Sequence, residues 1–387
     1  MVYQVNKGRS YVKYTCWALS AAVAAAISSS ALAQSTEFSG DLRFGYYSFD
    51  REERNGTNPD DGQWRLRARA GLLWTINDTY SVKGRYAARV HHEDNDSEFR
   101  LYRGLNGGSS IGPGQSTLDE LYVRARYGNW DHRIGRFQSN NRLVGVAAKS
   151  FSRTNSTSWD VGWTDGIQST WRGPNGWNLT GIIERNDKEE GPSNLRRAPL
   201  GFDKSESRAT YYLALDSRET DGLWAQRSVD ITYIPSSLYY NGYAAGMTED
   251  YLGITGRLAT QVTIRNEMKL VSGVELAYAP DTPAKAVMNL PGSGDVDGFA
   301  WQVSINLMDI VPGHSVGFVH GENDAGWLLS TDFGNNASLT EVRYARRPMS
   351  GHLLEARIRQ REDLIQQRTA VRKRSEQDFY VRYSISI

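Results

Sequence analysis

The sequence has a single cysteine, Cys16, among 387 residues. Cys16 lies in an N-terminal stretch with a basic beginning, an alanine-rich apolar run and the small-residue site Ala31-Leu32-Ala33, which together are typical of a secretory signal peptide. We therefore expect residues 1–33 to be removed and residues 34–387 to form the mature protein. Without a thiol, the mature protein has no disulfide, no thiolate metal site and no thiol nucleophile.

Long hydrophobic runs and reactive-residue motifs are also absent. No stretch of residues 34–387 reaches the roughly 18 consecutive apolar residues that a transmembrane helix needs. The six histidines show no metal-binding spacing, and no serine stands in a nucleophile elbow. We therefore expect no catalytic residues, no metal and no cofactor. A net charge of only +1 gives no electrostatic reason to expect nucleic acid as a partner.

What the sequence does contain is alternation at period two. From Trp64 to Ala70, apolar residues alternate with Arg65, Arg67 and Arg69. In a β-strand this pattern puts the apolar side chains on one face and three guanidinium groups on the other. The outer face of a soluble sandwich usually mixes both signs of charge, whereas a strand between lipid and a water-filled lumen satisfies both of these faces.

The same pattern recurs along the whole mature chain. Short segments of alternating residues are separated by connections that are alternately short and long, as expected when one end of a barrel faces the periplasm and the other faces outside. The sequence therefore predicts an all-β fold, a transmembrane antiparallel β-barrel with short periplasmic turns, long extracellular loops and about sixteen strands. We expect these strands near residues 37–48, 63–76, 79–91, 117–127, 131–138, 163–171, 177–185, 209–216, 226–234, 251–259, 267–279, 298–307, 315–322, 338–346, 352–361 and 377–387.

The last segment carries a resemblance to a known family. Its residues from Phe379 to Ile387 alternate between apolar and polar, and the runs Ile134-Gly135-Arg136-Phe137-Gln138 and Thr164-Asp165-Gly166-Ile167-Gln168 stand at a strand end and a strand start. In these features the chain resembles the Gram-negative outer-membrane porin family, although that family usually ends in Phe and this chain ends in Ile387.

The resemblance implies a location and partners. It implies the cell outer membrane of a Gram-negative bacterium, contact with membrane lipid and lipopolysaccharide, a homotrimer, and recognition of residues 378–387 by the barrel assembly machinery. It also implies that the third long loop, residues 139–162, folds inward as a constriction. An ordinary surface loop is the alternative for that segment. The charged residues of this loop are Arg142, Lys149, Arg153 and Asp160.

The candidate pore residues are the basic side chains on the polar faces of the strands. Each would cost about 2–4 kcal/mol if it faced lipid at the middle of the bilayer, so we expect all of them to face a water-filled lumen. Neighbouring antiparallel strands would bring them together in one basic wall. These predicted pore-lining residues are Arg65, Arg67, Arg69, Lys83, Arg85, Arg89, Arg124, Arg126, Arg133, Arg357, Arg359 and Arg382.

The function that follows is passive diffusion of small hydrophilic solutes and ions through a basic, anion-favouring channel. Three alternatives remain open from the sequence. The arginines pair with acids and only brace the barrel, or the channel is specific for an acidic solute such as phosphate, a carboxylate or an acidic sugar. The third alternative is a barrel that is not a channel, either an adhesin or an enzyme.

Overall fold

The computed structural model describes residues 35–101, 110–156, 158–187, 207–219, 222–239, 248–265 and 267–387. The predicted signal peptide, residues 1–33, lies outside the described residues. No helix among the described residues is long and apolar enough to cross a membrane.

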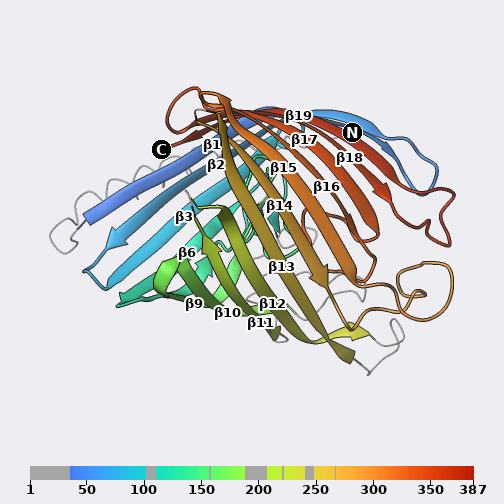
Figure 1. Ribbon diagram of the computed structural model, residues 1–387, viewed down its shortest axis with the longest axis horizontal. Coiled ribbons are helices and arrows are strands. Elements are labelled where there is room, and N and C mark those ends of the chain that lie inside the picture. The colour runs from blue at the N-terminus through green and yellow to red at the C-terminus, as the bar shows by residue number, and fades with distance from the viewer. Residues whose placement is uncertain are drawn as a thin grey trace, which may run out of the picture.

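The described chain is built almost entirely of β-strands (Figure 1). Sixteen long strands coincide one by one with the sixteen segments expected from the sequence, so this prediction is confirmed. Their bounds are β1 (Ser35–Glu52), β2 (Asp60–Thr75), β3 (Tyr80–His91), β6 (Gln115–Tyr127), β7 (Trp130–Phe137), β9 (Thr164–Arg172), β10 (Trp177–Asp187), β11 (Ser207–Arg218), β12 (Trp224–Tyr239), β13 (Thr248–Arg265), β14 (Met268–Tyr278), β15 (Phe299–Val311), β16 (His314–Asn323), β17 (Ala337–Arg346), β18 (His352–Asp363) and β19 (Ser375–Ser386).

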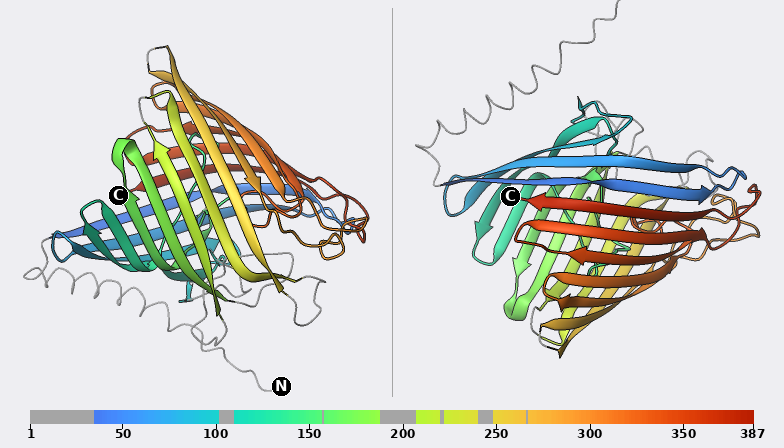
Figure 2. Two further views of the ribbon diagram at one scale, coloured as in Figure 1. Left: turned by 60° about the horizontal axis from the view of Figure 1, so that its bottom comes forward. Right: turned by 90° about the horizontal axis from the view of Figure 1, so that it is seen from above.

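The long strands form one closed antiparallel barrel. Each pairs with the next along the chain, and β1 also pairs with β19, with Gly45 opposite Arg382. The first and last strands therefore lie side by side (Figure 2). Closure leaves no unpaired sheet edge, which is the condition for a sheet to span a membrane.

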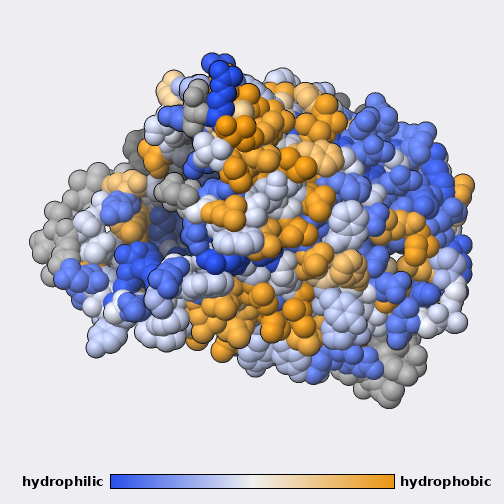
Figure 3. All heavy atoms as spheres, in the orientation of Figure 1, coloured by the Kyte–Doolittle hydropathy of each residue, from blue (hydrophilic) through white to orange (hydrophobic). Residues whose placement is uncertain are grey.

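The two faces of the strands differ as the alternation predicts. On β2 the outward Trp64 is 52% exposed, whereas the neighbouring inward Arg67 is fully buried. Apolar side chains gather across the middle of the visible outer face, and hydrophilic ones lie towards its two ends (Figure 3). This distribution matches an apolar band in contact with lipid, with polar rims in water.

Short turns join the strands at the barrel end that carries the described termini. The β15–β16 turn contains Gly313, whose φ of +78° falls in the left-handed region that favours glycine. The longer connections that the structure describes lie at the opposite end. Two of them also hold short strands: β4 (Glu98–Phe99) pairs with β6, and β5 (Ser110–Ile111) pairs with β8 (Val161–Gly162).

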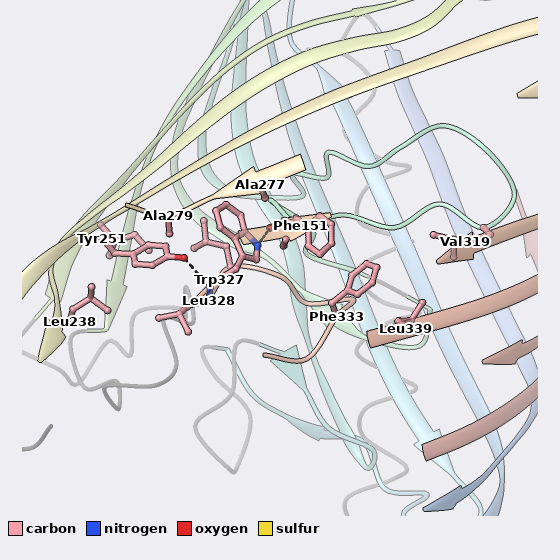
Figure 4. Close-up of a cluster of buried hydrophobic side chains, with 14 residues drawn as sticks. Phe151, Leu238, Tyr251, Ala277, Ala279, Val319, Trp327, Leu328, Phe333 and Leu339 are labelled. Atoms are coloured by element: carbon pink, nitrogen blue, oxygen red, sulfur yellow. Dashed lines mark hydrogen bonds between the residues drawn. The ribbon is translucent and has the colours of Figure 1, made fainter. Parts of the chain in front are cut away.

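An apolar cluster fills part of the barrel interior. Phe151, from the segment between β7 and β9, packs with Trp327 and Phe333, from the segment between β16 and β17 (Figure 4). Inward side chains of the wall, including Tyr251 and Leu339, complete the cluster. Trp327 also donates a hydrogen bond from Nε1 to the carbonyl oxygen of Phe151 at 2.9 Å. These contacts hold the two segments together on one side of the barrel interior. An open space lies on the other side of the interior.

Candidate functional site

The open space is a cavity of about 530 Å³. It lies between residues 142–160 of the segment between β7 and β9 and the inward faces of β1, β2, β17, β18 and β19. Along β18 it touches every inward position from Leu353 to Arg361. Eight residues of extended chain cover roughly 26 Å, so the cavity follows most of the height of the barrel wall, as a channel does.

Basic side chains dominate the lining of this cavity. Ten lining residues carry a positive charge and three carry a negative charge. The acids are Asp160, Asp332 and Glu355. The basic residues are Arg43, Arg65, Arg142, Lys149, Arg343, Arg347, Arg357, Arg359, Arg361 and Arg382.

Several carboxylates near the cavity are each shared by more than one cation. Glu341, fully buried behind the lining, forms an ion pair with Lys149, with 2.7 Å between Oε2 and Nζ, and also pairs with Arg343 and Arg357. Asp378 is shared in the same way by Arg357 and Arg359. Sharing keeps the guanidinium groups in place but does not cancel their charge, so the wall stays positive towards the cavity.

Three of the lining cations have no carboxylate partner within 4 Å among the described residues: Arg65, Arg142 and Arg347. Arg65 instead donates to Gln63 Oε1 and stacks on the ring of Tyr47, with 4.0 Å from its guanidinium carbon to the ring centroid. A cation without a matching anion contributes its full charge to the potential of the cavity.

Residues 139–162 cross the interior of the barrel. The backbone N–H of Phe151 donates to Glu275 on β14 at 3.1 Å, and Arg153 pairs with Glu184 on β10. On the opposite side, the carbonyl oxygen of Ser158 accepts a 2.7 Å hydrogen bond from Arg43 on β1. Contacts with such widely separated strands place this segment inside the barrel, beside the cavity.

The structure divides the predicted pore residues into two groups. Four of the twelve line the cavity, and of the four loop residues Arg142, Lys149 and Asp160 line it, while Arg153 lies away from it against Glu184 and Thr164. The other eight face inward on β2, β3, β6 and β7, outside the cavity lining, and we call them the braced wall. They are Arg67, Arg69, Lys83, Arg85, Arg89, Arg124, Arg126 and Arg133.

Acids and loop backbone cover most of the braced wall, whereas the side chain of Arg126 is 53% exposed. Asp41 pairs with both Arg67 and Arg69, and Asp119 accepts two hydrogen bonds from Arg85 at 2.8 and 2.9 Å. Arg67 also donates to the carbonyl oxygens of Ser158 and Asp160. The arginines of this wall therefore hold the barrel and the inserted segment together.

Four cavity arginines were not among the sequence candidates: Arg43, Arg343, Arg347 and Arg361. The signal for Arg343 is present in the sequence, because Glu341, Arg343 and Ala345 alternate with the outward Val342 and Tyr344.

At the mouth, short ionic contacts join the first and last loops to the strands. Arg54 donates to both carboxylate oxygens of Asp363, at 2.6 and 2.7 Å, and these hydrogen bonds raise the pKa of Arg54. Arg372 reaches across to the carbonyl oxygens of Glu53 and Thr57. These contacts therefore hold the loops at the rim of the barrel in place beside the cavity.

Comparisons with known proteins agree with this geometry. The profile of a family described as Gram-negative porin matches residues 18–188. Among solved structures, OprB of Pseudomonas putida has a TM-score of 0.58 at 12% identity, over 91% of this chain and 94% of that one. An anion-selective porin from Comamonas acidovorans has a TM-score of 0.55 at 10% identity, over 91% and 100%. OccD3 of Pseudomonas aeruginosa has 0.52 at 11%, over 92% of each. The search of curated proteins found no match.

Proposed function

We propose that the chain is a Gram-negative outer-membrane porin that forms a channel for small solutes, and that it is a passive diffusion porin whose lumen favours anions. The observation that carries the proposal is the lining of the cavity, with ten basic and three acidic residues. The similar barrel from Comamonas acidovorans, which is described as anion-selective, supports the same selectivity.

The proposed mechanism is physical rather than chemical. Solutes move down their concentration gradients, and the size and charge of the narrowest part decide which ones pass. A sixteen-stranded barrel encloses a wide lumen, and residues 139–162 act as the constriction that narrows it. In this narrow space, the positive wall raises the local concentration of anions and lowers that of cations.

The family and the fold are those of a channel rather than an enzyme. That the protein catalyses no reaction is part of the proposal. A homotrimer, contact with lipopolysaccharide and recognition of residues 378–387 by the assembly machinery remain predictions, supported by the outward aromatic and aliphatic residues that alternate along β19.

The proposal is tested by electrical recording of the purified protein in a planar bilayer. We expect an open, ion-permeable state, and a reversal potential in a KCl gradient that shows preference for chloride. The preference should be large at 0.1 M salt and small at 1 M, because the Debye length falls from about 10 Å to about 3 Å. A cation preference, or a protein that conducts no ions, would overturn the proposal.

A further inference from the structure

The outer face of the barrel is hollowed between β9 and β12. A groove of about 310 Å³ lies there, and we call it the outer groove. On β10 its lining includes Gly181 and Ile183, which alternate with Ile182 and Glu184, each only 2% exposed and turned towards the interior. The outer groove therefore opens towards the surroundings of the barrel and is separate from the channel.

Strand pairing arranges the outward residues of the outer groove in two rows across four strands. Each row takes one residue from each of β9, β10, β11 and β12, and the upper row lies nearer the long loops. The upper row is Ile167, Ile183, Tyr211 and Tyr233, and the lower row is Ser169, Gly181, Leu213 and Ile231. The lining is therefore apolar except for one serine and the tyrosine hydroxyls.

Glycine opens the outer groove at its centre. A Cβ atom at Gly181 would have no neighbouring heavy atom within 4 Å, so strand packing does not require glycine at this position. The side chains of Ile183 and Tyr211 stand beside it and are 51% and 44% exposed. An open hollow bordered by exposed apolar side chains is typical of a surface that holds an apolar ligand.

Polar groups at the upper end of the outer groove fix its level in the membrane. The hydroxyl of Tyr233 donates a hydrogen bond to Asp250, which also accepts one from the backbone N–H of Ser236 at 2.8 Å. Tyrosines with an apolar ring and a hydrogen-bonded hydroxyl are typical of the membrane–water interface. The long loops follow β10 and β12 directly, so the outer groove lies just below the headgroups of the extracellular leaflet.

The charge above the outer groove favours an anionic lipid. Arg185 is two residues beyond Ile183 on β10, so it projects outward one row above the groove, and its side chain is exposed. The carboxylate of Asp250 already accepts two hydrogen bonds from the protein. A cation above an apolar hollow, continuous with the lipid-facing side of the barrel, matches a lipid whose acyl chains lie below a phosphorylated headgroup.

We infer that the outer groove holds one acyl chain of lipopolysaccharide, the anionic lipid of the extracellular leaflet, as a specifically bound lipid. The inference rests on the outer-membrane location in the proposed function and not on the anion preference of the channel. The strands of such a barrel are tilted by about 35–45°, so a chain that stands upright in the leaflet crosses them from the upper row to the lower row. The chain then fills the hollow over Gly181 while a headgroup phosphate lies beside Arg185.

The test measures binding of lipopolysaccharide to the purified, delipidated protein in detergent by native mass spectrometry. We expect one molecule to bind, and we expect Gly181→Leu to lower the affinity by about tenfold, because leucine takes the space of roughly two methylene groups of the chain. The new side chain faces open space, so the barrel should form. Circular dichroism and heat-dependent electrophoretic mobility verify that it does.

The matched control is Gly84→Leu. Gly84 on β3 also has no heavy atom within 4 Å of its Cβ position, and it pairs with Leu72 and the outward, 49% exposed Leu121, but it lies outside the outer groove. This variant should bind lipopolysaccharide like the wild type. Arg185→Gln should weaken binding by about threefold, as expected for an exposed ion pair. Lipopolysaccharide without its phosphates should bind the wild type and Arg185→Gln equally.

The outcomes separate the occupants of the outer groove. Equal affinity in Gly181→Leu and the wild type would overturn the inference. Equally tight binding of phosphatidylethanolamine that also depends on Gly181 would overturn it in favour of a phospholipid. A changed oligomeric state in Gly181→Leu, with unchanged lipid affinity, would overturn it in favour of a second copy of this chain.

The proposed function is measured separately, by the reversal potential in a KCl gradient. A chloride-preferring channel without Gly181-dependent binding of lipopolysaccharide would overturn the lipid site and leave the anion-favouring porin intact. A cation-preferring channel that keeps this binding would overturn the anion preference and leave the lipid site intact.

Discussion

Two basic walls face the interior of this barrel, and they have different roles. The braced wall on β2, β3, β6 and β7 lies under loop backbone, as where Arg89 donates to the carbonyl oxygen of Ile111. The cavity wall, formed by Arg343, Arg357, Arg359, Arg361 and Arg382 on β17, β18 and β19, faces open space. The same alternation of residues produces both walls, so alternation does not explain the difference between them. The segments that fold inward determine which arginines are accessible to solutes.

The segments that cover the braced wall hold each other in place. β5 and β8 pair across the interior, with Ile111 opposite Val161, and these two residues pack with Ala87 of β3. Over the cavity wall, Ser158 and Trp159 of the inserted segment contact Arg382, but the inserted residues leave the 530 Å³ space beside the other arginines. The braced wall should therefore matter most for stability, and the cavity wall for selectivity.

The largest expected effect is on stability, from Asp119→Ala in the braced wall. Asp119 is fully buried and neutralises Arg85, with Arg69 3.6 Å away. Removing it leaves buried guanidinium groups under-compensated, so the free energy of unfolding should fall by about 3 kcal/mol. Urea unfolding of the protein in lipid vesicles measures this loss. The reversal potential in a KCl gradient should stay close to that of the wild type.

Asp119→Asn is the control, because the amide oxygen still accepts hydrogen bonds and only the charge is lost. It should be less destabilising than Asp119→Ala. If Asp119→Ala unfolded like the wild type, or changed ion preference strongly, the braced wall would not be the structural element described above.

The fold could be predicted from the sequence because the pattern that determines each strand lies within that strand's own residues. Each strand needs only alternating residues and a turn signal, and lipid outside with water inside enforces the pattern on every strand. The sequence has no clearly marked turn between residues 251–259 and 267–279, but β13 and β14 form because each carries its own alternation. The arginines of Trp64–Ala70 face inward as this alternation requires.

The division of the arginines into two walls could not be predicted in this way. Period two shows that Arg67 and Arg65 share a face, but not that Ser158 and Asp160 would cover Arg67 and leave Arg65 open. That difference depends on contacts between segments about 90 residues apart, which no local pattern encodes. The close approach of β1 and β19 at Gly45 likewise depends on closure between the first and last strands.

The next effect is on selectivity, and it compares cations that line the cavity with cations of the braced wall. Changing Arg65, Arg142 and Arg347 together to Gln removes three cavity cations that have no carboxylate partner among the described residues. The ratio of chloride to potassium permeability should fall on the order of a few-fold, because the positive potential of the narrow lumen is reduced. Reversal potentials at low salt measure this ratio.

The matched control is a triple variant in which three cations of the braced wall are replaced by Gln. These cations are Lys83, Arg126 and Arg133. None of them has a carboxylate oxygen closer than 3.9 Å in the described structure, so both triple variants remove three positive charges without leaving a close ion pair broken. The control should leave the permeability ratio nearly unchanged. Equal shifts in both triple variants would mean that these cavity cations and the braced-wall cations do not differ in their access to ions.

The smallest effect tests the sharing of acids at the cavity wall. Lys149→Met keeps the packing of the buried stem and removes one of three cations around Glu341, which retains Arg343 and Arg357. The free energy of unfolding should therefore fall by only about 1 kcal/mol. Glu341→Gln removes the shared carboxylate itself and should cost clearly more, because three buried cations then lose a common partner. Urea unfolding of both variants in vesicles gives the order, and an equal loss would show that Lys149 holds the inserted segment in a way that the neighbouring arginines cannot replace.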